Sequence, residues 1–503
     1  MSIATTSDAV VAPDISPVSG SRRWLALAVI AVSQLLIVLD ATITTIALPT
    51  AQKALHISDA NRQWVITTYA LAFGGLLLLG GRIADYTGRK RAFIIGLLGF
   101  AAASALGGIA VNEGMLFAAR ALQGAFGALM APAALSLLTV TFTEAKDRAR
   151  AFGVYGAIAG GGGAVGLLLG GVLTEYASWR WTLLISTPIA IVAALAAVRF
   201  VDESRAEGNT RYDLPGALTS TLGLVALVYG FTKASSDGWG AAATVVSLVA
   251  AGLLLVAFVV IELRSAHPLL PMRVILERNR GGAFLSALLL GVGIFGVFLF
   301  LTFYLQITLG YSALQTGVAF LPFTVGIILG AGLSAQLLTR VGPRVLMSAG
   351  LLLAAAGLVL LTRIGVDTGF WSHVFPGELI ISFGMGVTFG PMSSTALVGV
   401  ADHDAGVASA LINTTQQIGG SLGTALLNTI FTSAVAGYLV AHQHDITSPS
   451  QLPALQAVAT VHSYTVAFWV SAALIGLASL IALVLIQGRR SEVAASDADP
   501  VAV

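Results

Sequence analysis

The stretch LLIVLDATITTIALP, residues 35–49, places one carboxylate, Asp40, inside an apolar run that begins at Trp24. Asp40 lies sixteen residues after Trp24. In a helix this separation is roughly 24 Å, which puts the carboxylate beyond the middle of an apolar layer about 30 Å thick. A charge at that depth is costly, so Asp40 is a candidate functional residue that should face protein or a water-filled cavity. The alternative is an Asp near a helix end whose side chain reaches water.

The composition around this stretch identifies the class of protein. Apolar residues make up 56% and charged residues 10% of the 503 residues, whereas about 25% of a typical soluble domain is charged. The mean hydropathy is +0.89, so we expect an all-α polytopic membrane protein embedded in a lipid bilayer. The chain has no Cys, which excludes disulfides and Cys-ligated metals. We expect no cofactor, no metal, no nucleic-acid partner and no obligatory protein partner.

Apolar segments long enough to cross a bilayer recur along the whole chain. The first is about 25 residues long, which is typical of a retained membrane helix rather than a signal peptide. Fourteen such segments are expected, at residues 24–48, 63–80, 91–110, 115–140, 151–173, 181–200, 215–232, 240–262, 282–306, 314–337, 345–363, 371–398, 407–435 and 463–487.

The distribution of Lys and Arg supports this count. If the connections alternate between two sides and the N-terminus is inside, twenty basic residues lie inside and five outside. Cytoplasmic loops are enriched in Lys and Arg, and a missed span would have scrambled the asymmetry. We therefore expect a multi-pass protein of the cytoplasmic membrane with both termini in the cytoplasm. The five outer residues are Lys53, Arg62, Arg180, Lys233 and Arg363, and Arg120 falls inside a span.

Two weak internal repeats indicate two related halves. Gly88 is matched 254 residues later by Gly342, and the pair Gly163 and Gly166 is matched 257 residues later by Gly420 and Gly423. Internal repeats are typical of secondary transporters, whose substrate sites lie where the halves meet. The expected organisation is a disordered N-terminus (1–21), a six-helix half (24–200), a linker (201–280) with two extra spans (215–232 and 240–262), a second six-helix half (281–487) and a cytoplasmic tail (488–503).

Four motifs resemble those of a known family. They are LDATITTIALP at 39–49, GRIADYTGRKR at 81–91, LFAARALQGAFGA at 116–128 and GVYGAIAGGGGAVGLLLGG at 153–171. Together they are similar to motifs of the fourteen-span drug:proton antiporters of the major facilitator superfamily, the EmrB/QacA-like multidrug exporters. The resemblance implies the major facilitator fold, with two six-helix bundles, two additional central spans and 14 transmembrane helices in all. Leu167 stands where the fifth-span motif usually has Pro, which weakens any expectation of a kink there.

Three ionisable residues are expected at membrane depth. Arg120 lies about 9 Å into the fourth span, which nearly matches the depth of Asp40 measured from its own outer end. Either Arg120 and Asp40 pair directly, or both line one cavity with Gln34 and Gln123 as hydrogen-bonding neighbours. We expect Asp40, biased by Arg120, to carry a coupling proton. Glu378, near the start of the twelfth span, is a second acidic candidate, although its side chain could equally reach water.

Two glycine-containing motifs have physical interpretations of their own. The first inner loop combines Gly81, Asp85, Gly88, Arg89 and Lys90. Its charges either set topology or hold helix ends together in one conformation and release them in another. In the fifth span, glycines recur at four-residue spacing, which suits either a dimer interface or, as we favour, a close-packed seam between the halves. Gly156 and Gly160, then Gly162, Gly166 and Gly170, have this spacing, and the residues expected at the seam are Gly156, Gly160, Gly163, Gly166 and Gly170.

Polar residues in the thirteenth span are candidates for the wall of a substrate cavity. They are Asn413, Gln416 and Gln417. His442, His444 and His462 lie in the long connection to the last span, where we expect solvated loop residues rather than a metal site.

Three classes of function compete. The first is a proton-coupled antiporter that exports hydrophobic or amphipathic small molecules, such as drugs, antibiotics and dyes, by alternating access. The second is a transporter of the same fold with a dedicated endogenous cargo. An intramembrane enzyme is disfavoured because no catalytic motif lies at membrane depth, and no Lys is preceded by the Gly of a phosphate-binding loop, which excludes an ATP-driven pump.

Overall fold

The computed structural model describes residues 20–205, 213–265, 268–270, 272–398, 400, 405–445 and 449–487. Its regular elements in this part of the chain are helices. The first bundle and the two extra spans comprise α1 (Gly20–Leu55), α2 (Trp64–Thr87), α3 (Arg89–Gly108), α4 (Glu113–Thr141), α5 (Ala145–Tyr176), α6 (Trp181–Leu184), α7 (Ser186–Phe200), α8 (Leu214–Asp237) and α9 (Ala242–Arg264). The remaining helices are α10 (Met272–Ile275), α11 (Arg278–Phe303), η1 (Tyr304–Thr308), α12 (Ala313–Ala319), α13 (Leu321–Val341), α14 (Pro343–Leu361), η2 (Phe370–Val374), α15 (Phe375–Leu397), α16 (Ala405–His442), η3 (Gln443–Asp445), η4 (Pro449–Gln451) and α17 (Leu452–Leu485).

The helices account for the expected membrane spans. Thirteen helical segments of the described residues are long and apolar enough to cross a membrane. α5, with 32 residues, is also long enough and supplies the fourteenth. One expected span is built from α6 followed by α7, and another from α12 followed by α13. These helices confirm the all-α polytopic architecture.

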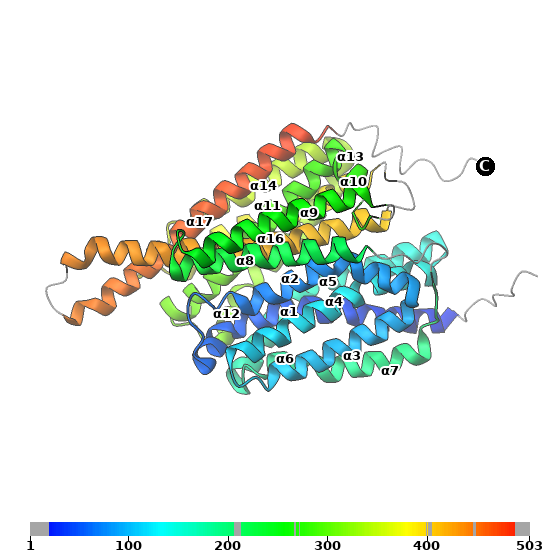
Figure 1. Cartoon of the computed structure of the whole chain (residues 1–503), viewed down its shortest axis with the longest axis horizontal. Coiled ribbons are helices and arrows are strands. Elements are labelled where there is room, and N and C mark those ends of the chain that lie inside the picture. The colour runs from blue at the N-terminus through cyan, green and yellow to red at the C-terminus, as the bar shows by residue number, and fades with distance from the viewer. Residues whose placement is uncertain are drawn as a thin grey trace, which may run out of the picture.

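The helices form two bundles with α8 and α9 beside their junction (Figure 1). α1–α7 make one bundle and α11–α17 the other, while α8 packs against both α2 and α16. α9 packs on α8 and is mostly exposed on its other sides. α1 begins and α17 ends at the same end of the molecule, which we call the terminal face, and the opposite end is the far face.

Glycines at matching positions show that the two bundles are built alike. Gly88 separates α2 from α3 with φ of 116°, and Gly342 separates α13 from α14 with φ of 87°. Both backbones lie in a region that L side chains rarely adopt, so glycine is needed at each sharp connection. The second pair of repeats also occupies equivalent places, because Gly166 packs on α1 and Gly423 on α11.

The part of the α5 glycine stripe whose surroundings are described, Gly163, Gly166 and Gly170, faces α1 rather than the other bundle, which corrects the expectation of a seam between the halves. A Cβ at Gly166 would lie 3.2 Å from Leu39 O, and one at Gly170 would lie 3.0 Å from Ile43 O, so these glycines let α5 approach α1 within one bundle. Gly163 also faces α1, at Thr42, whereas the side-chain environments of Gly156 and Gly160 lie outside the described residues. Four-residue spacing marks one face of a helix but does not identify its neighbour. The neighbouring face of α5 meets the second bundle, where a Cβ at Gly171 would lie 2.7 Å from the Leu314 backbone of α12.

The connection between the last two spans is mainly helical rather than a loop. α16 continues through His442, and α17 begins at Leu452, so His462 lies within a helix. The two helices extend beyond the rest of the bundle at the far face (Figure 1). The described residues contain no group of three possible metal ligands.

Candidate functional site

Asp40 and Arg120 form an ion pair in the interior of the first bundle. Arg120 of α4 donates a hydrogen bond from Nη1 to Asp40 Oδ2 of α1 at 2.5 Å. Asp40 is 0% and Arg120 1% exposed. The pair is therefore direct and enclosed by protein, which is one of the two arrangements expected from their matching depths.

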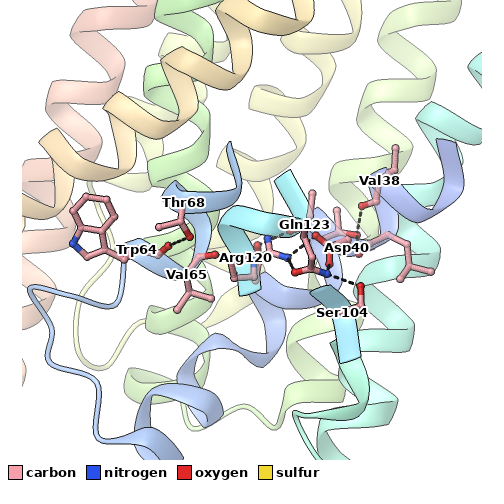
Figure 2. A network of polar contacts seen from close by, with 12 residues as sticks. Val38, Asp40, Trp64, Val65, Thr68, Ser104, Arg120 and Gln123 are labelled. Carbon is pink, nitrogen blue, oxygen red and sulfur yellow. Dashed lines mark hydrogen bonds and ion pairs between the residues drawn. The ribbon is translucent and has the colours of Figure 1, made fainter. Parts of the chain in front are cut away.

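Gln123 and Ser104 extend this pair into a network that joins three helices (Figure 2). Gln123 Nε2 donates to Asp40 Oδ1 at 3.0 Å and to Ser104 Oγ of α3 at 2.8 Å. Gln123 Oε1 accepts a hydrogen bond from Arg120 Nη1 at 3.0 Å. Gln123 lies three residues after Arg120 on the same face of α4, so one helix supplies both donors to the carboxylate.

α2 completes the surroundings of the guanidinium. Arg120 Nε donates to the Val65 carbonyl at 2.9 Å, and the guanidinium carbon lies 4.5 Å from the centre of the Tyr69 ring. Gly124 permits this approach, because a Cβ there would collide with the Tyr69 carbonyl. We call Asp40, Arg120, Gln123, Ser104 and Tyr69 the charge network. A buried ion pair is tolerated only when its remaining hydrogen-bonding groups are also satisfied. Asp40, Arg120, Gln123 and Ser104 meet this condition, whereas the Tyr69 hydroxyl is buried without a hydrogen-bond partner.

Binding of one proton to Asp40 would change the charge and the hydrogen bonds of the network. Protonation of Asp40 would remove the negative charge that Arg120 faces. The same proton would alter the hydrogen bond from Gln123, because a protonated carboxyl is a donor as well as an acceptor. The site therefore links one proton to contacts among α1, α2, α3 and α4.

Other expected site residues do not join the charge network. Gln34 lies six residues before Asp40, about 1.7 helical turns away, and is therefore on another side of α1. Of the polar residues of α16, Asn413 is exposed, while the Gln417 Cβ would lie 2.9 Å from a Cβ at Gly74 of α2. The Gln416 carbonyl faces Gly291 of α11. Asn413 and Gln417 thus lie on the side of α16 that is directed toward the first bundle.

Glu378 is buried at the start of α15, far along the chain from the charge network. It is 1% exposed, and neither carboxyl oxygen has a hydrogen-bond partner. The Glu378 side chain does not reach solvent in this conformation. The alternative expectation, that this carboxyl extends to water, therefore does not hold here.

The loop between α2 and α3 is tied mainly to its own bundle. Arg89 Nε donates to Asp85 Oδ1 at 2.9 Å, and Lys90 Nζ donates to the Val198 carbonyl at 2.9 Å. Glu203 accepts from Lys90 N at 3.0 Å and would lie against a Cβ at Gly88. Gly81 faces Pro132 of α4.

A second buried arginine, Arg62, lies at the far face. It lies just before α2 and is 3% exposed. Its guanidinium carbon lies 4.2 Å from the centre of the Phe303 ring and 4.9 Å from that of Phe431, both in the second bundle. Burial lowers the pKa of Arg62, while Tyr464 and Asp59 act in the opposite direction. The aromatic rings and Asp59 thus offset part of the cost of removing this charge from water.

Hydrogen bonds across the junction of the bundles surround Arg62. Asn428 of α16 donates from Nδ2 to the Asp59 carbonyl at 3.0 Å and accepts from Arg62 Nε at 3.4 Å. The Thr67 and Thr424 hydroxyls are 2.8 Å apart. We call Arg62, Asn428, Phe303, Phe431, Thr67 and Thr424 the far-face seal. From the sequence, Arg62 is expected only as a topology-setting charge, and no motif distinguishes Asn428. Thr424 and Asn428 are four residues apart, as are Asn413 and Gln417, and residues at this spacing lie on one side of a helix. This spacing was the signal from which a polar side of α16 could have been predicted.

Comparisons with known proteins agree with this architecture. The model of the Major Facilitator Superfamily matches residues 30–424. The chain is 50% identical over 489 residues to the puromycin resistance protein pur8 of Streptomyces alboniger, covering 95% of this chain and 96% of that protein. It is 41% identical over 421 residues to the cephamycin export protein CmcT of Amycolatopsis lactamdurans, covering 83% and 87%. A solved structure of a bacterial homologue of the human lysosomal transporter Spinster shares the fold, with a TM-score of 0.64 at 17% identity, and the match covers 93% of this chain and 98% of that one.

Proposed function

Because this chain belongs to the Major Facilitator Superfamily, we propose that it is a proton-coupled antiporter that exports hydrophobic or amphipathic small molecules, antibiotics among them. The names of its relatives, a puromycin resistance protein and a cephamycin export protein, support an antibiotic cargo. The cargo would move across the cytoplasmic membrane by alternating access between the two bundles.

The buried charge network carries this proposal. In our account Asp40 takes up a proton from the outside, which cancels its attraction for Arg120. When water reaches the site from the cytoplasm, Asp40 loses the proton and pairs with Arg120 again. A carboxylate at membrane depth is suited to such a relay because its charge state is sensitive to hydration and to its neighbours.

The far-face seal supports a direction for the cycle. We infer that the terminal face is cytoplasmic and that the far-face seal closes the outer end in this conformation. The basic residues of the loops support that orientation. The loop with Gly81, Asp85, Gly88, Arg89 and Lys90 would then hold the inner helix ends when the outer end opens.

The other polar residues expected at the site would bind cargo or carry a second proton. Asn413, Gln416 and Gln417 of α16, together with Gln34 and Gln123, would offer polar groups to the cargo. Glu378 would be a second proton-carrying residue, because a buried carboxyl without a partner is costly in its charged form. Neither role requires a cofactor or a protein partner.

Transport by purified protein in sealed proteoliposomes tests the proposal. A proton gradient directed opposite to the cargo movement should drive accumulation of puromycin or of ethidium. A protonophore should abolish this accumulation. Addition of cargo should also produce proton movement in the opposite direction. Cargo movement that is indifferent to the proton gradient would refute proton coupling, whereas no movement of either tested compound would refute the choice of cargo.

The second candidate is an exporter dedicated to one natural product. One observation favours it: the two relatives described above are each named for a single antibiotic or antibiotic class. Competition among puromycin, a cephamycin and ethidium in the same vesicles separates the two candidates. A dedicated exporter should accumulate only one of them, whereas a multidrug exporter should show mutual inhibition.

A further inference from the structure

Two carboxylates outside the charge network meet near the terminal face, where α8 and α9 join the linker. Asp213 precedes α8, and its Oδ1 accepts a hydrogen bond from Gly216 N at 2.8 Å. Glu262 lies in the last turn of α9, and its Oε2 accepts one from Leu270 N at 3.0 Å. Asp213 is 7% and Glu262 3% exposed. Each carboxylate thus uses one oxygen to fix the backbone.

The other oxygen of each carboxylate has no partner and is directed to a shared space. Asp213 Oδ2 and Glu262 Oε1 are both buried without a hydrogen bond. A Cβ at Gly216 would lie 2.7 Å from Glu262 Oε1 and 3.0 Å from Asp213 Oδ2. Two carboxylates whose free oxygens both lie within 3.0 Å of one point in a buried site repel each other when both are ionised. One proton between them would remove the repulsion and give both oxygens a partner.

The described cations around Asp213 and Glu262 form no ion pair with either carboxylate, so their charges do not replace this proton. Arg82 of α2 is the cation that acts on Glu262, and its guanidinium donates to the Pro268 carbonyl at 3.3 Å and to Tyr86 Oη at 3.2 Å. On the next turn of α2, Asp85 pairs with Arg89. Arg264 of α9 is exposed. Within the described part of the chain, neither carboxylate forms an ion pair within 4.0 Å.

We propose that Asp213 and Glu262 form a proton-binding site in which the two carboxyl groups share one proton and hold residues 268–270 against α9. Loss of this proton to water would set two negative charges side by side and push Glu262 away from Asp213. The linker backbone, which Glu262 holds through Leu270, would move with it. Because Arg82 contacts the same linker, the site connects the proton concentration at the terminal face with the loop that begins at Gly81. The site is separate from Asp40 and does not rest on the proposed transport function.

Infrared titration of the purified full-length protein measures the proton directly, because a protonated carboxyl has a carbonyl band that a carboxylate lacks. The variants are Glu262→Gln and Asp213→Asn, each of which retains an oxygen to accept its backbone hydrogen bond. Removing either partner removes the like charge, so the titration of the remaining carboxyl should shift to lower pH by about one pH unit or more. The control is Asp237→Asn at the other end of α8, an exposed carboxylate that accepts from Lys233 at 3.2 Å. It should leave the titration unchanged.

A third variant keeps both carboxyls and separates them. Gly216→Ala would place a methyl group against both free oxygens, 2.7 Å from Glu262 Oε1 and 3.0 Å from Asp213 Oδ2. If it forces the two carboxyls apart, the titration should also shift to lower pH. A titration that is the same in the wild type and in the variants that fold would overturn the proposal. Two carboxyl bands that titrate independently, each removed by one of the two substitutions, would overturn it as well.

A distance measurement tests the movement of the linker. The chain has no Cys, so spin labels at Thr87→Cys and Leu276→Cys report one distance. That distance should change with pH in the otherwise unmodified protein and not in the presence of Glu262→Gln.

Discussion

Among single residues, Arg120 is held by more hydrogen bonds than its charge alone would require. Its planar guanidinium donates in three directions, to Asp40, to Gln123 and to the Val65 carbonyl. A lysine ammonium has the same charge but not the same fixed fork of donors. Shape as well as charge should therefore matter at this position.

We predict that Arg120→Lys inserts into the membrane but loses most of its gradient-driven transport. The loss of one charged hydrogen bond, worth about 1.5–3 kcal/mol, should lower the coupled rate roughly tenfold or more. Transport of a fluorescent cation in vesicles with matched protein content measures this. Arg363→Lys, at an exposed position, is the control. Unchanged transport by Arg120→Lys would make charge alone sufficient.

The residue scale is also where the sequence was most informative. The depths of Asp40 and Arg120 along their helices predicted that the two side chains could pair, because helical rise is nearly constant. Ser104 and Tyr69 could not be predicted, since a buried Ser or Tyr has no distinctive spacing. Arg62 was missed because a basic residue in a loop normally sets topology and remains in water.

At the scale of helices, the glycine stripe of α5 sets how closely α5 approaches α1. A Cβ at Gly166 would collide with Thr42 Oγ1 and lie 3.2 Å from the Leu39 carbonyl, one residue before Asp40. The sequence predicted that this face of α5 is closely packed but assigned it to the wrong neighbour. Periodicity identifies a helix face, whereas its partner depends on the arrangement of the whole bundle.

We predict that Gly166→Ala lowers the thermal stability of the purified protein. The added methyl group overpacks the α1–α5 contact, which typically costs about 1–3 kcal/mol. Gly252→Ala in α9 is a matched control, because no atom lies within 4 Å of its added Cβ. Thermal unfolding monitored in detergent should show a lower transition for Gly166→Ala only. Equal transitions would mean that α5 can shift away from α1 without cost.

At the scale of the whole molecule, the two bundles are joined at the far face through the far-face seal. Arg62 belongs to the first bundle, but its rings and its amide partner belong to the second. Opening of this end must therefore withdraw a guanidinium from between two aromatic rings. The sequence predicted two halves and their repeat, but not the residues that join them, because contacts between bundles arise from their packing and not from local pattern.

We predict that Arg62→Ala opens the far-face seal more often. The test uses Thr67→Cys, a buried position in a chain without other Cys. An impermeant thiol reagent added to whole cells should label this cysteine several times faster when Arg62→Ala is also present. Exposed Arg363→Ala serves as the control. Labelling that is slow in both backgrounds would show that Arg62 does not limit opening.

We propose that Asp40 carries the coupling proton, and transport by Asp40→Asn in proteoliposomes tests this claim. The amide retains the size of the carboxyl and some of its hydrogen bonds but cannot titrate. The account predicts that this variant still exchanges labelled for unlabelled cargo across the membrane without a gradient, while a proton gradient no longer drives accumulation. Accumulation against a cargo gradient by Asp40→Asn, at the rate of the wild type and sensitive to a protonophore, would contradict the claim and move the coupling proton to another residue.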